Sequence, residues 1–326
     1  MKTIKWGIIG CGAVCEVKSG PGFQQAENSG LVAVMRRDAE KAKDFAERHG
    51  VPKWYSDAHE LINDPEVNAI YIATPPKFHL EYVRLAAPSG KPIYVEKPMG
   101  RNYAECLEMI EICESAGVPL FVAYYRQRLP YFLKVKSILD SGVIGTPTSL
   151  SLELFKSPKP NDNNPAQNWR VDPDVSGGGY FHDLASHQFD LLEFLFGEIE
   201  SASGSSNSSL LANPAEDFVS ATFKFSSGLV GTGNWNFAVN PDQVKDEMLI
   251  QGTKGSIRFG FFNGDIPIIV ETDAGQEKYQ VPYPPHVQQP LIQSIVDELR
   301  DEGKCPSSGR TASRANWVMD QVLGRI

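Results

Sequence analysis

Ile4-Lys5-Trp6-Gly7-Ile8-Ile9-Gly10-Cys11-Gly12-Ala13-Val14-Cys15 is the stretch that decides the fold of this chain. Its first half is a short apolar run with the length of a buried strand, and its second half turns on two glycines. Gly10 permits a tight turn, and Gly12 lets another group approach the backbone closely. We therefore predict a strand that ends at Ile9 and a helix that begins directly after the turn.

The alternation of apolar runs and helical patterns continues to about Tyr124. The other expected strands are Leu31–Met35, Ala69–Ala73, Pro92–Val95 and Leu120–Ala123, and the expected helices are Ala39–His49, Phe78–Ala87 and Asn102–Ala116. Strands that alternate with helices of this length form βαβ units around a parallel sheet. We predict a doubly wound, Rossmann-type domain over residues 1–124. The Pro-Gly pair at 21–22 predicts that its first helix is short or bent.

The pattern changes after Tyr125. The expected elements are helices over Leu129–Ser141 and Tyr180–Phe196, a long loop over Ser157–Gly179, strands with hairpin turns from Glu200 to Val281, and closing helices over about His286–Glu302 and Thr311–Leu323. Strands joined by short turns of Gly, Asn, Asp and Ser form antiparallel sheets. Residues 125–326 are therefore expected to form an α+β domain with a mostly antiparallel sheet.

Composition narrows the classes of function. The chain has 326 residues and a formal net charge of −9, from 31 basic and 40 acidic residues, which disfavours a nucleic-acid or anionic-membrane surface. No run of about 18 apolar residues indicates a membrane span. The five cysteines are few and lack the spacing of a disulfide framework or zinc site. We expect a cytoplasmic protein with a small-molecule partner.

The glycine turn is suited to the phosphates of a dinucleotide. Backbone N–H groups at the start of a helix favour anions, and the first turn of a βα unit is where a pyrophosphate binds. The candidate contacts are Gly10, Cys11, Gly12, Ala13 and Val14. Cys15 replaces the third glycine of the usual pattern, and a plain tight turn is the alternative interpretation.

The residues after the second expected strand bear on the choice of dinucleotide. An acid there bonds the ribose hydroxyls, whereas arginine accommodates a 2′-phosphate. Arg36 and Arg37 offer bidentate phosphate binding, and Asp38 is well placed as the N-cap of the following helix. We expect NADP to be preferred over NAD. The alternative is two solvated arginines with Asp38 on the ribose.

Two further strand ends carry candidate cofactor contacts. After Ala69–Ala73, the consecutive prolines hold a rigid turn, whose candidate residues are Thr74, Pro75, Pro76 and His79. These prolines could also serve only to end the strand and start the helix. Glu96 and Lys97 follow Pro92–Val95, at the edge where ligands of open α/β sheets bind. An ordinary surface ion pair would explain the same two residues.

The run Gly177–His187 is the most informative part of the second half. Three glycines precede a helix on which Asp183 and His187 share a face. A histidine can transfer a proton near neutral pH, and a carboxylate beside it can orient it or hold substrate hydroxyls. The alternatives are a helix-surface pair and a metal site that includes His182. Because His182 and His187 are five positions apart, they match a two-histidine helical site poorly, and we expect no metal.

Together these motifs resemble those of the Gfo/Idh/MocA oxidoreductases, which include glucose–fructose oxidoreductase, inositol dehydrogenase and 1,5-anhydrofructose reductase. The resemblance covers the whole chain, because Gly10–Cys15, Thr74–His79, Glu96–Pro98 and Gly177–His187 occur in the family's order and at about its spacing. Cys15 departs from the family pattern, and so does Ala185, where many members carry glycine. The family implies a Rossmann domain followed by a mostly antiparallel sheet that serves the active site and subunit contacts.

The resemblance also implies roles for individual residues. Lys97 is identified as the catalytic lysine beside the nicotinamide, His187 as the acid or base at the reacting oxygen, and Asp183 as its partner on the substrate side. Trp169-Arg170 resembles a pair that some sugar reductases of the family place near the nicotinamide amide. Glu96 is interpreted as a residue that positions Lys97 or the nicotinamide ribose.

The activity implied by the resemblance is an NAD(P)-dependent hydride transfer to or from a carbonyl or hydroxyl carbon of a sugar or polyol. A dimer or tetramer formed through the second domain's sheet is implied as well. The alternatives are a dehydrogenase or reductase for a dihydrodiol or tetrapyrrole-like substrate, and a non-catalytic cofactor-binding sensor on the same fold. The loop Ser157–Val175 is expected to line the substrate pocket, and polar Asn161–Gln167 favours a polyol.

Overall fold

The computed structural model describes residues 3–326, which divide into two compact units. One unit extends to Leu129 and includes Pro284–Asn316, and the other consists of Pro130–Tyr283 with Trp317–Ile326. This division differs from the expected domains, 1–124 and 125–326, because Tyr125–Leu129 and Pro284–Asn316 fall in the first unit. Residues 1–2 lie outside the described part. The segment Pro284–Asn316 belongs with the first unit because its side chains bond there, as Gln288 does to Glu96 at 2.6 Å.

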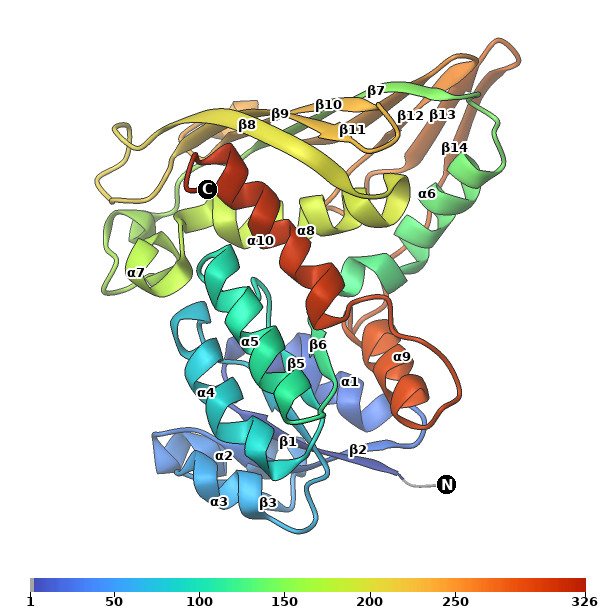
Figure 1. The fold of residues 1–326 in the computed structure, drawn as a ribbon. Coiled ribbons are helices and arrows are strands. Elements are labelled where there is room, and N and C mark those ends of the chain that lie inside the picture. Colours follow the sequence, from blue (N-terminus) through green and yellow to red (C-terminus); the bar gives the residue numbers. More distant parts are fainter. Residues whose placement is uncertain (1–2) are drawn as a thin grey trace. The chain divides into compact units, whose positions relative to one another are not determined.

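The first unit contains a six-stranded parallel sheet in the order β3-β2-β1-β4-β5-β6 (Figure 1). Its strands are β1 (Ile4–Ile9), β2 (Ser29–Met35), β3 (Lys53–Tyr55), β4 (Ala69–Ile72), β5 (Ile93–Val95) and β6 (Leu120–Val122). Its helices are η1 (Cys15–Ser19), α1 (Gly20–Gln25), α2 (Ala39–His49), α3 (Ala58–Asn63), η2 (Pro76–Phe78), α4 (His79–Ala86), η3 (Ala87–Ser89), α5 (Tyr103–Ser115), η4 (Tyr125–Arg128) and α9 (Gln289–Leu299). The strand order reverses at β1 and β4, and the Rossmann-type prediction is confirmed.

Short elements account for what the sequence did not predict in this unit. The strand β3 has three residues and the helix α3 has six, so neither is long enough to show a clear period. The first helix is short, as expected, and it follows a π-helical turn, η1. The amide of Gly20 donates to the carbonyl of Cys15, and a Cβ atom at Gly20 would lie 2.3 Å from that oxygen.

The second unit contains an eight-stranded sheet in the order β14-β13-β12-β11-β7-β10-β9-β8. Its strands are β7 (Pro147–Phe155), β8 (Ile199–Asn207), β9 (Phe218–Phe225), β10 (Val230–Asn236), β11 (Lys245–Gly252), β12 (Gly255–Phe259), β13 (Ile268–Thr272) and β14 (Gly275–Tyr279). Its helices are α6 (Pro130–Asp140), η5 (Pro160–Asn163), η6 (Trp169–Val171), α7 (Pro173–Ser176), α8 (Gly179–Phe196) and η7 (Pro241–Gln243). The helix α10 (Gly309–Val322) begins in the first unit and ends in this one.

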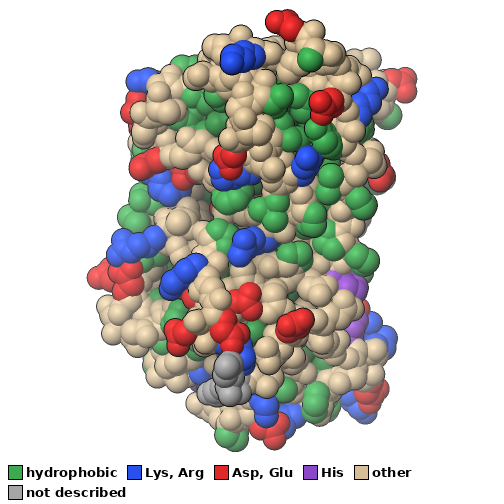
Figure 2. Space-filling model, turned by 90° about the vertical axis from the view of Figure 1, so that its right-hand side faces the viewer, with side chains coloured by type: hydrophobic (Ala, Val, Ile, Leu, Met, Phe, Trp, Pro, Cys, Tyr) green, Lys and Arg blue, Asp and Glu red, His purple; other side chains and the backbone are tan. Residues whose placement is uncertain are grey.

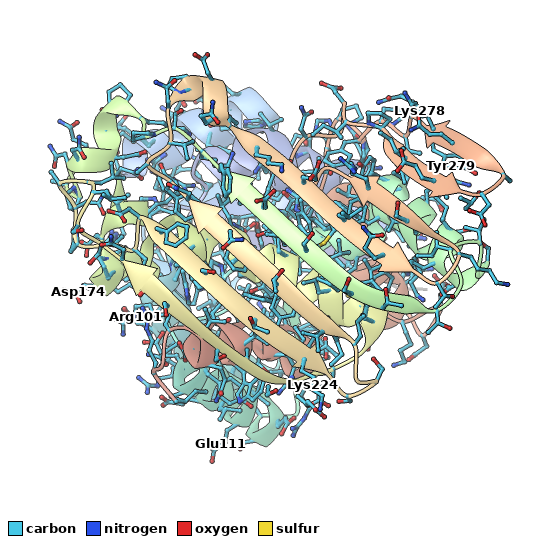
Figure 3. The ribbon with its side chains drawn as sticks, turned by 90° about the horizontal axis from the view of Figure 1, so that it is seen from above. Arg101, Glu111, Asp174, Lys224, Lys278 and Tyr279 are labelled. Atoms are coloured by element: carbon cyan, nitrogen blue, oxygen red, sulfur yellow. The ribbon has the colours of Figure 1, made fainter. Side chains whose placement is uncertain are left out.

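The mostly antiparallel arrangement of this sheet is confirmed. Among the described strands of this sheet, β7 and β10 pair in parallel and the other neighbours pair antiparallel; β7 was not predicted from the sequence. The helices α6 and α8 pack on one face, where Phe132 lies 6.3 Å from Phe259 and Phe189 lies 5.6 Å from Trp235, measured between ring centroids. Among residues 3–326, no helix covers the opposite face of these strands (Figure 3).

The surface charge and the apolar character of the helices bear on the expectations from composition. Basic and acidic side chains are interspersed over one face of the molecule (Figure 2). Within residues 3–326, no helix combines the length and apolar character that a membrane span requires.

Candidate active site

The loops with candidate cofactor residues leave the first sheet at one edge, because the carboxyl ends of parallel strands lie together. The loop Gly10–Cys15 follows β1, Arg36 follows β2, Thr74 follows β4 and Glu96 follows β5. The backbone links two of these loops directly, since the Gly10 amide donates to the carbonyl of Met35 at 2.9 Å. The fold therefore brings together four groups of residues that are far apart in the chain.

The shape of the glycine turn fits a bound phosphate group. Gly10 has φ +89°, and a Cβ atom there would lie 2.7 Å from Cγ2 of Thr74, so the turn requires glycine. A Cβ atom at Gly12 would meet only the Gly10 carbonyl, at 3.8 Å, so the space beside the backbone is open. Within the described residues, the buried hydroxyl of Thr74 has no hydrogen-bond partner. An open cradle beside an unsatisfied hydroxyl fits a dinucleotide.

The backbone amides of the glycine turn differ in whether they already have an acceptor within the protein. Those of Gly10 and Cys11 donate to the carbonyl of Met35, at 2.9 and 3.2 Å, and so hold the turn itself. Ala13 and Val14, which follow at the start of the helix, are the better placed candidates for phosphate donors.

The two cysteines of this loop are buried beneath it. Burial raises the pKa of Cys11 to about 11, and it raises the pKa of Cys15 well above its usual value. Both thiols therefore stay neutral at physiological pH and add no negative charge beside the phosphate loop.

The residues after β2 are arranged as the sequence predicted. Asp38 is the N-cap of α2, and its carboxylate accepts from the Lys41 amide at 3.2 Å and pairs with the Lys41 ammonium at 2.8 Å. These bonds lower the pKa of Asp38. Arg36 is half-buried, while Arg37 is exposed with its guanidinium 5.3 Å from the Phe78 ring centroid. The carboxylate is thus engaged in the helix cap, and the two guanidinium groups lie at the sheet edge.

His79 lies inside the protein and joins two of the loops. Its Nδ1 is 3.0 Å from the carbonyl of Met99, and its Nε2 is 2.7 Å from the carbonyl of Thr74. The ring is fully buried, and burial lowers the pKa of the imidazole. This placement lets His79 link the loops after β4 and β5, and the cofactor contact expected from the sequence stays a prediction.

Glu96 is the centre of a buried polar network beneath Lys97. Its carboxylate accepts from the Tyr71 hydroxyl, from Gln288 Nε2 at 2.6 Å and from the Lys97 amide at 3.1 Å. The Tyr94 hydroxyl donates to Gln288 at 3.1 Å, and burial beside Glu96 raises the pKa of both tyrosines. The network holds the backbone from which Lys97 projects. Sequence reasoning missed Gln288, which is 192 positions from Glu96 and has no local signal.

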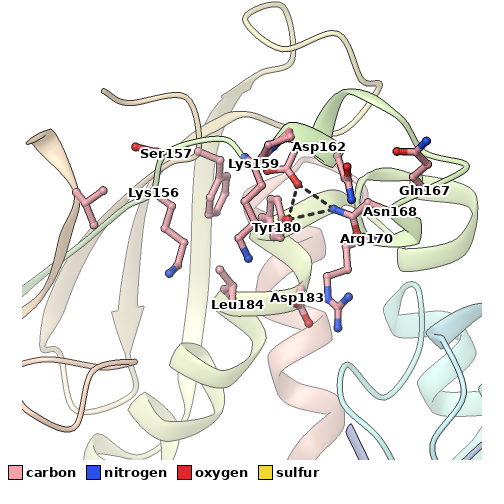
Figure 4. Close-up of a pocket in the computed structure, with 14 residues that line it drawn as sticks. Lys156, Ser157, Lys159, Asp162, Gln167, Asn168, Arg170, Tyr180, Asp183 and Leu184 are labelled. Carbon is pink, nitrogen blue, oxygen red and sulfur yellow. Dashed lines mark hydrogen bonds and ion pairs between the residues drawn. The ribbon is translucent and has the colours of Figure 1, made fainter. Parts of the chain in front are cut away.

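The second unit has a pocket of about 900 Å³ between α8 and the loop that precedes it (Figure 4). The residues that line it are Lys156, Ser157, Lys159, Pro160, Asn161, Asp162, Gln167, Asn168, Arg170, Tyr180, Asp183, Leu184, Phe237 and Val244. Most of them belong to the loop after β7 that the sequence predicted to line a pocket. Eight of the fourteen lining residues carry a charge or an amide group, and four are apolar.

Asp183 faces this pocket from the first turns of α8. Its carboxylate lies 3.5 Å from Nε of Arg170, whose guanidinium stacks 4.6 Å from the Trp169 ring centroid. His187 follows one turn later, is 3% exposed and lies with its ring centroid 6.3 Å from that of Phe262. In the described residues, Asp183 belongs to the pocket lining, whereas His187 is not one of the lining residues.

Two local features hold α8 and the loop in place. Gly179 has φ +62°, and a Cβ atom there would lie 2.5 Å from Cβ of Ala215, so the helix start needs glycine. The buried Asp162 accepts from the Tyr180 hydroxyl at 2.7 Å, from Asn168 Nδ2 at 2.9 Å and from the Lys159 amide at 2.7 Å. Burial and Asp162 raise the pKa of Tyr180 to about 12. Sequence reasoning did not identify Asp162 or Tyr180.

Residues 4–124 match a family described as oxidoreductases with an NAD-binding Rossmann fold, and residues 132–258 match the GFO/IDH/MocA C-terminal domain. A relative from Formosa agariphila, "Oxidoreductase P35", is 43% identical over 98% of this chain and 98% of its own length. The trans-1,2-dihydrobenzene-1,2-diol dehydrogenase of Mus musculus is 29% identical over 78% of this chain and 73% of its own.

Among solved structures, a levoglucosan dehydrogenase in complex with NADH and L-sorbose is similar in fold. It superposes with a TM-score of 0.86 at 22% identity, over 98% of this chain and 96% of that chain. Both sheets of the present chain therefore have counterparts in a known fold.

Proposed function

The chain belongs to the GFO/IDH/MocA family of oxidoreductases, and on that premise we propose that it interconverts a hydroxyl and a carbonyl group of a sugar or polyol, with NADP as the preferred cofactor. The observation that carries the substrate class is the pocket beside α8, whose lining is rich in charged and amide side chains. Such a lining offers hydrogen bonds to many hydroxyl groups. The arginines after β2, with Asp38 engaged as a helix cap, support the NADP preference.

The cofactor would be held by the glycine turn, the arginines after β2 and the loop from Thr74 to Pro76, and when bound it supplies or accepts the hydride. Lys97 would stabilise the charge that develops on the reacting oxygen. The bond from its amide to Glu96 supports this role, because it fixes the backbone that carries the lysine. His187 would move the proton of that oxygen, and Asp183 would hold a substrate hydroxyl beside it.

The likeness to the mouse enzyme supports a second candidate function, a dehydrogenase for trans-dihydrodiols. The apolar cyclohexadiene ring of such a diol would favour an apolar wall, whereas the apolar members of this pocket's lining are Leu184, Phe237, Val244 and Pro160. The charged lining therefore favours a polyol. Family membership likewise favours an enzyme over a cofactor-binding sensor on the same fold.

A substrate screen tests the proposed reaction. Aldoses, ketoses, inositols, anhydro sugars and a trans-dihydrodiol would be offered with each nicotinamide cofactor, and the absorbance of the reduced nicotinamide followed. We expect turnover with a sugar or polyol. Turnover of the dihydrodiol alone would support the second candidate, and no turnover with any compound would count against an enzyme of this type.

Two substitutions test the catalytic roles. Because general acid–base assistance contributes about 10²–10⁴-fold, Lys97→Ala and His187→Ala should each lower kcat by that order. The Kd for the cofactor, measured by fluorescence titration, should change far less. The exposed Lys254→Ala in the second unit is the matched control. Near-normal kcat in both variants would refute the assignment.

We also propose a cytoplasmic location. All five cysteines are free and buried, which suits a reducing compartment. Fractionation of the native cells, followed by detection of the chain, would test this, and recovery outside the cytoplasm would contradict it.

A further inference from the structure

We propose that the substrate of the pocket beside α8 carries an oxyanion, a carboxylate or a phosphate or sulfate ester, that Lys156 and Lys159 bind. The inference rests on the proposed function, because it assigns the substrate class of the same site. It makes the substrate an acidic sugar or polyol derivative rather than a neutral one.

Three cationic side chains meet at this pocket. Lys156 follows the end of β7, Lys159 follows three positions later, and Arg170 comes from η6. Figure 4 shows their charged ends pointing to the same side of the pocket, the side on which Asp183 and Leu184 lie. Two lysines and an arginine from separate parts of one long loop therefore converge on one space.

The acidic residues of the lining do not neutralise the two lysines. Asp162 is 1% exposed, and its carboxylate is engaged by Tyr180, Asn168 and the Lys159 backbone amide. Asp183 is paired with Arg170. In residues 3–326, no carboxylate oxygen lies within 4.0 Å of the Lys156 or Lys159 ammonium nitrogen.

This excess of positive charge is a local feature. The chain as a whole has 40 acidic and 31 basic residues, so its composition does not lead one to expect a basic pocket. Like charges that face one cavity raise the local concentration of counter-ions and are stabilised when an anion binds between them. A neutral polyol would supply hydrogen bonds but would leave the charges uncompensated.

The rest of the lining completes the match. Asn161 and Gln167 line the pocket with amide groups that suit substrate hydroxyls, and Figure 4 shows Asp183 between the charged ends of Lys159 and Arg170. Because Arg170 is ion-paired with Asp183, the two lysines are the proposed partners of the oxyanion. An acidic group on one part of the substrate and hydroxyls on the rest would use the whole lining.

Binding to the full chain with NADP present tests this without requiring turnover. Isothermal titration would compare glucose with glucuronate, glucose 6-phosphate and glucose 6-sulfate, at low and high salt. We expect the acidic sugars to bind at least about 10-fold more tightly than glucose, with a preference that weakens as salt rises. The three acids distinguish a carboxylate from a phosphate or sulfate ester. Equal or tighter binding of glucose would overturn the proposal.

Charge-removing variants locate the effect. Lys156→Gln and Lys159→Gln should each weaken the binding of the preferred acidic sugar about 10-fold, as expected for one charge-assisted hydrogen bond, and should change the Kd for NADP little. Lys278→Gln, on β14 and exposed (Figure 3), removes the same charge outside the pocket and is the control. Unchanged affinity for the acid in both lysine variants, or a loss confined to NADP, would refute the role.

The outcomes for the two proposals can be told apart. If only neutral sugars are turned over, the proposed reaction is supported and the proposal of an oxyanion on the substrate is refuted. If acidic sugars bind in a way that depends on Lys156 and Lys159 but no compound is turned over, the proposed reaction is refuted and the proposed oxyanion binding is supported.

Discussion

Asp38 and the two arginines before it are the residues on which the choice of cofactor turns. The Asp38 carboxylate accepts from the Lys41 amide at 3.2 Å and is paired with the Lys41 ammonium. A carboxylate with these partners gains little by turning to a ribose. Arg36 and Arg37 have no competing role in the helix cap, and a 2′-phosphate is the anion that a pair of guanidinium groups fits best.

Removal of both arginines should therefore change the cofactor preference. In Arg36→Ala/Arg37→Ala, we expect KM for NADP(H) to rise about 10²- to 10⁴-fold, since each of the two arginines loses a charge-assisted hydrogen bond of about 1.5–3 kcal/mol, while KM for NAD(H) changes little. Asp38→Asn keeps the cap and is the control, with an unchanged preference. A specific rise in KM for NAD(H) in Asp38→Asn would show that Asp38 binds the ribose.

The first helical turn after the glycine loop is tied to α2 by an ion pair. Glu16, in η1, accepts from Arg48 at 2.8 and 2.9 Å through both oxygens, and its Oε2 lies 2.7 Å from His49 Nε2. The hydrogen bonds from Arg48 are the main reason that the pKa of Glu16 falls to about 2. The cluster thus anchors the element that begins the candidate phosphate site.

The stability of this link should depend on pH. Because the folded pKa of Glu16 is depressed from 4.5 to about 2, its stabilising effect is present above pH 4.5 and is lost as the pH falls towards 2. Glu16→Gln should lower Tm by about 1–3 °C at pH 7, a small effect because the pair is partly exposed. Scanning calorimetry should show the difference from wild type shrinking below pH 4.5. Glu111→Gln, exposed on α5, should show neither effect, and a constant difference at all pH values would contradict the account.

The start of α8 depends on a glycine for two reasons. Gly179 combines φ +62° with a would-be Cβ contact of 2.5 Å to Ala215, whereas Gly142 has φ +69° and no atom within 4 Å of that position. Gly142→Ala should cost only the backbone strain, about 1–2 kcal/mol of the free energy of unfolding, and Gly179→Ala should cost about 1–3 kcal/mol more. Urea unfolding would measure both. Equal losses would show that the region near Ala215 adjusts freely.

At the level of the whole molecule, we propose that the uncovered face of the eight-stranded sheet is a subunit interface, as the family resemblance implies. Salt bridges cross it between strands, Lys245 with Glu153 and Arg258 with Glu247. Thr232 is exposed on β10, in register with Ser151 of β7 and Thr222 of β9. The centre of this face thus consists of small hydroxyl side chains flanked by paired charges, which allows close approach of a second sheet.

Solution scattering should give a mass two or four times 36.0 kDa. Thr232→Lys should shift it towards the monomer, because a lysine buried without a partner costs several kcal/mol. Ser56→Lys, exposed in the first unit, should leave the mass unchanged. A monomeric mass for the wild-type protein would remove the proposed interface.

Features that depend on neighbouring residues were predicted well from the sequence. The helix α2 has the predicted bounds, Ala39–His49, because Asp38 caps its start and Gly50 ends it in the left-handed conformation. The short first helix was also predicted, from the Pro-Gly pair. In contrast, β3 and α3 were not predicted because they are too short to show a hydrophobic period. The strand β7 was not predicted because buried and exposed side chains alternate weakly in its first residues.

Local patterns in the chain were thus enough to specify the glycine turn after β1, the parallel sheet and the helix that carries Asp183 and His187. Capping, turn formation and periodicity act over a few residues, so they can be read along the chain. The partnership of Gln288 with Glu96 and the meeting of Lys156, Lys159 and Arg170 in one pocket became visible only in the folded chain. Hydrogen bonds and charges act through space between residues that no local pattern links, and packing alone decides which of them meet.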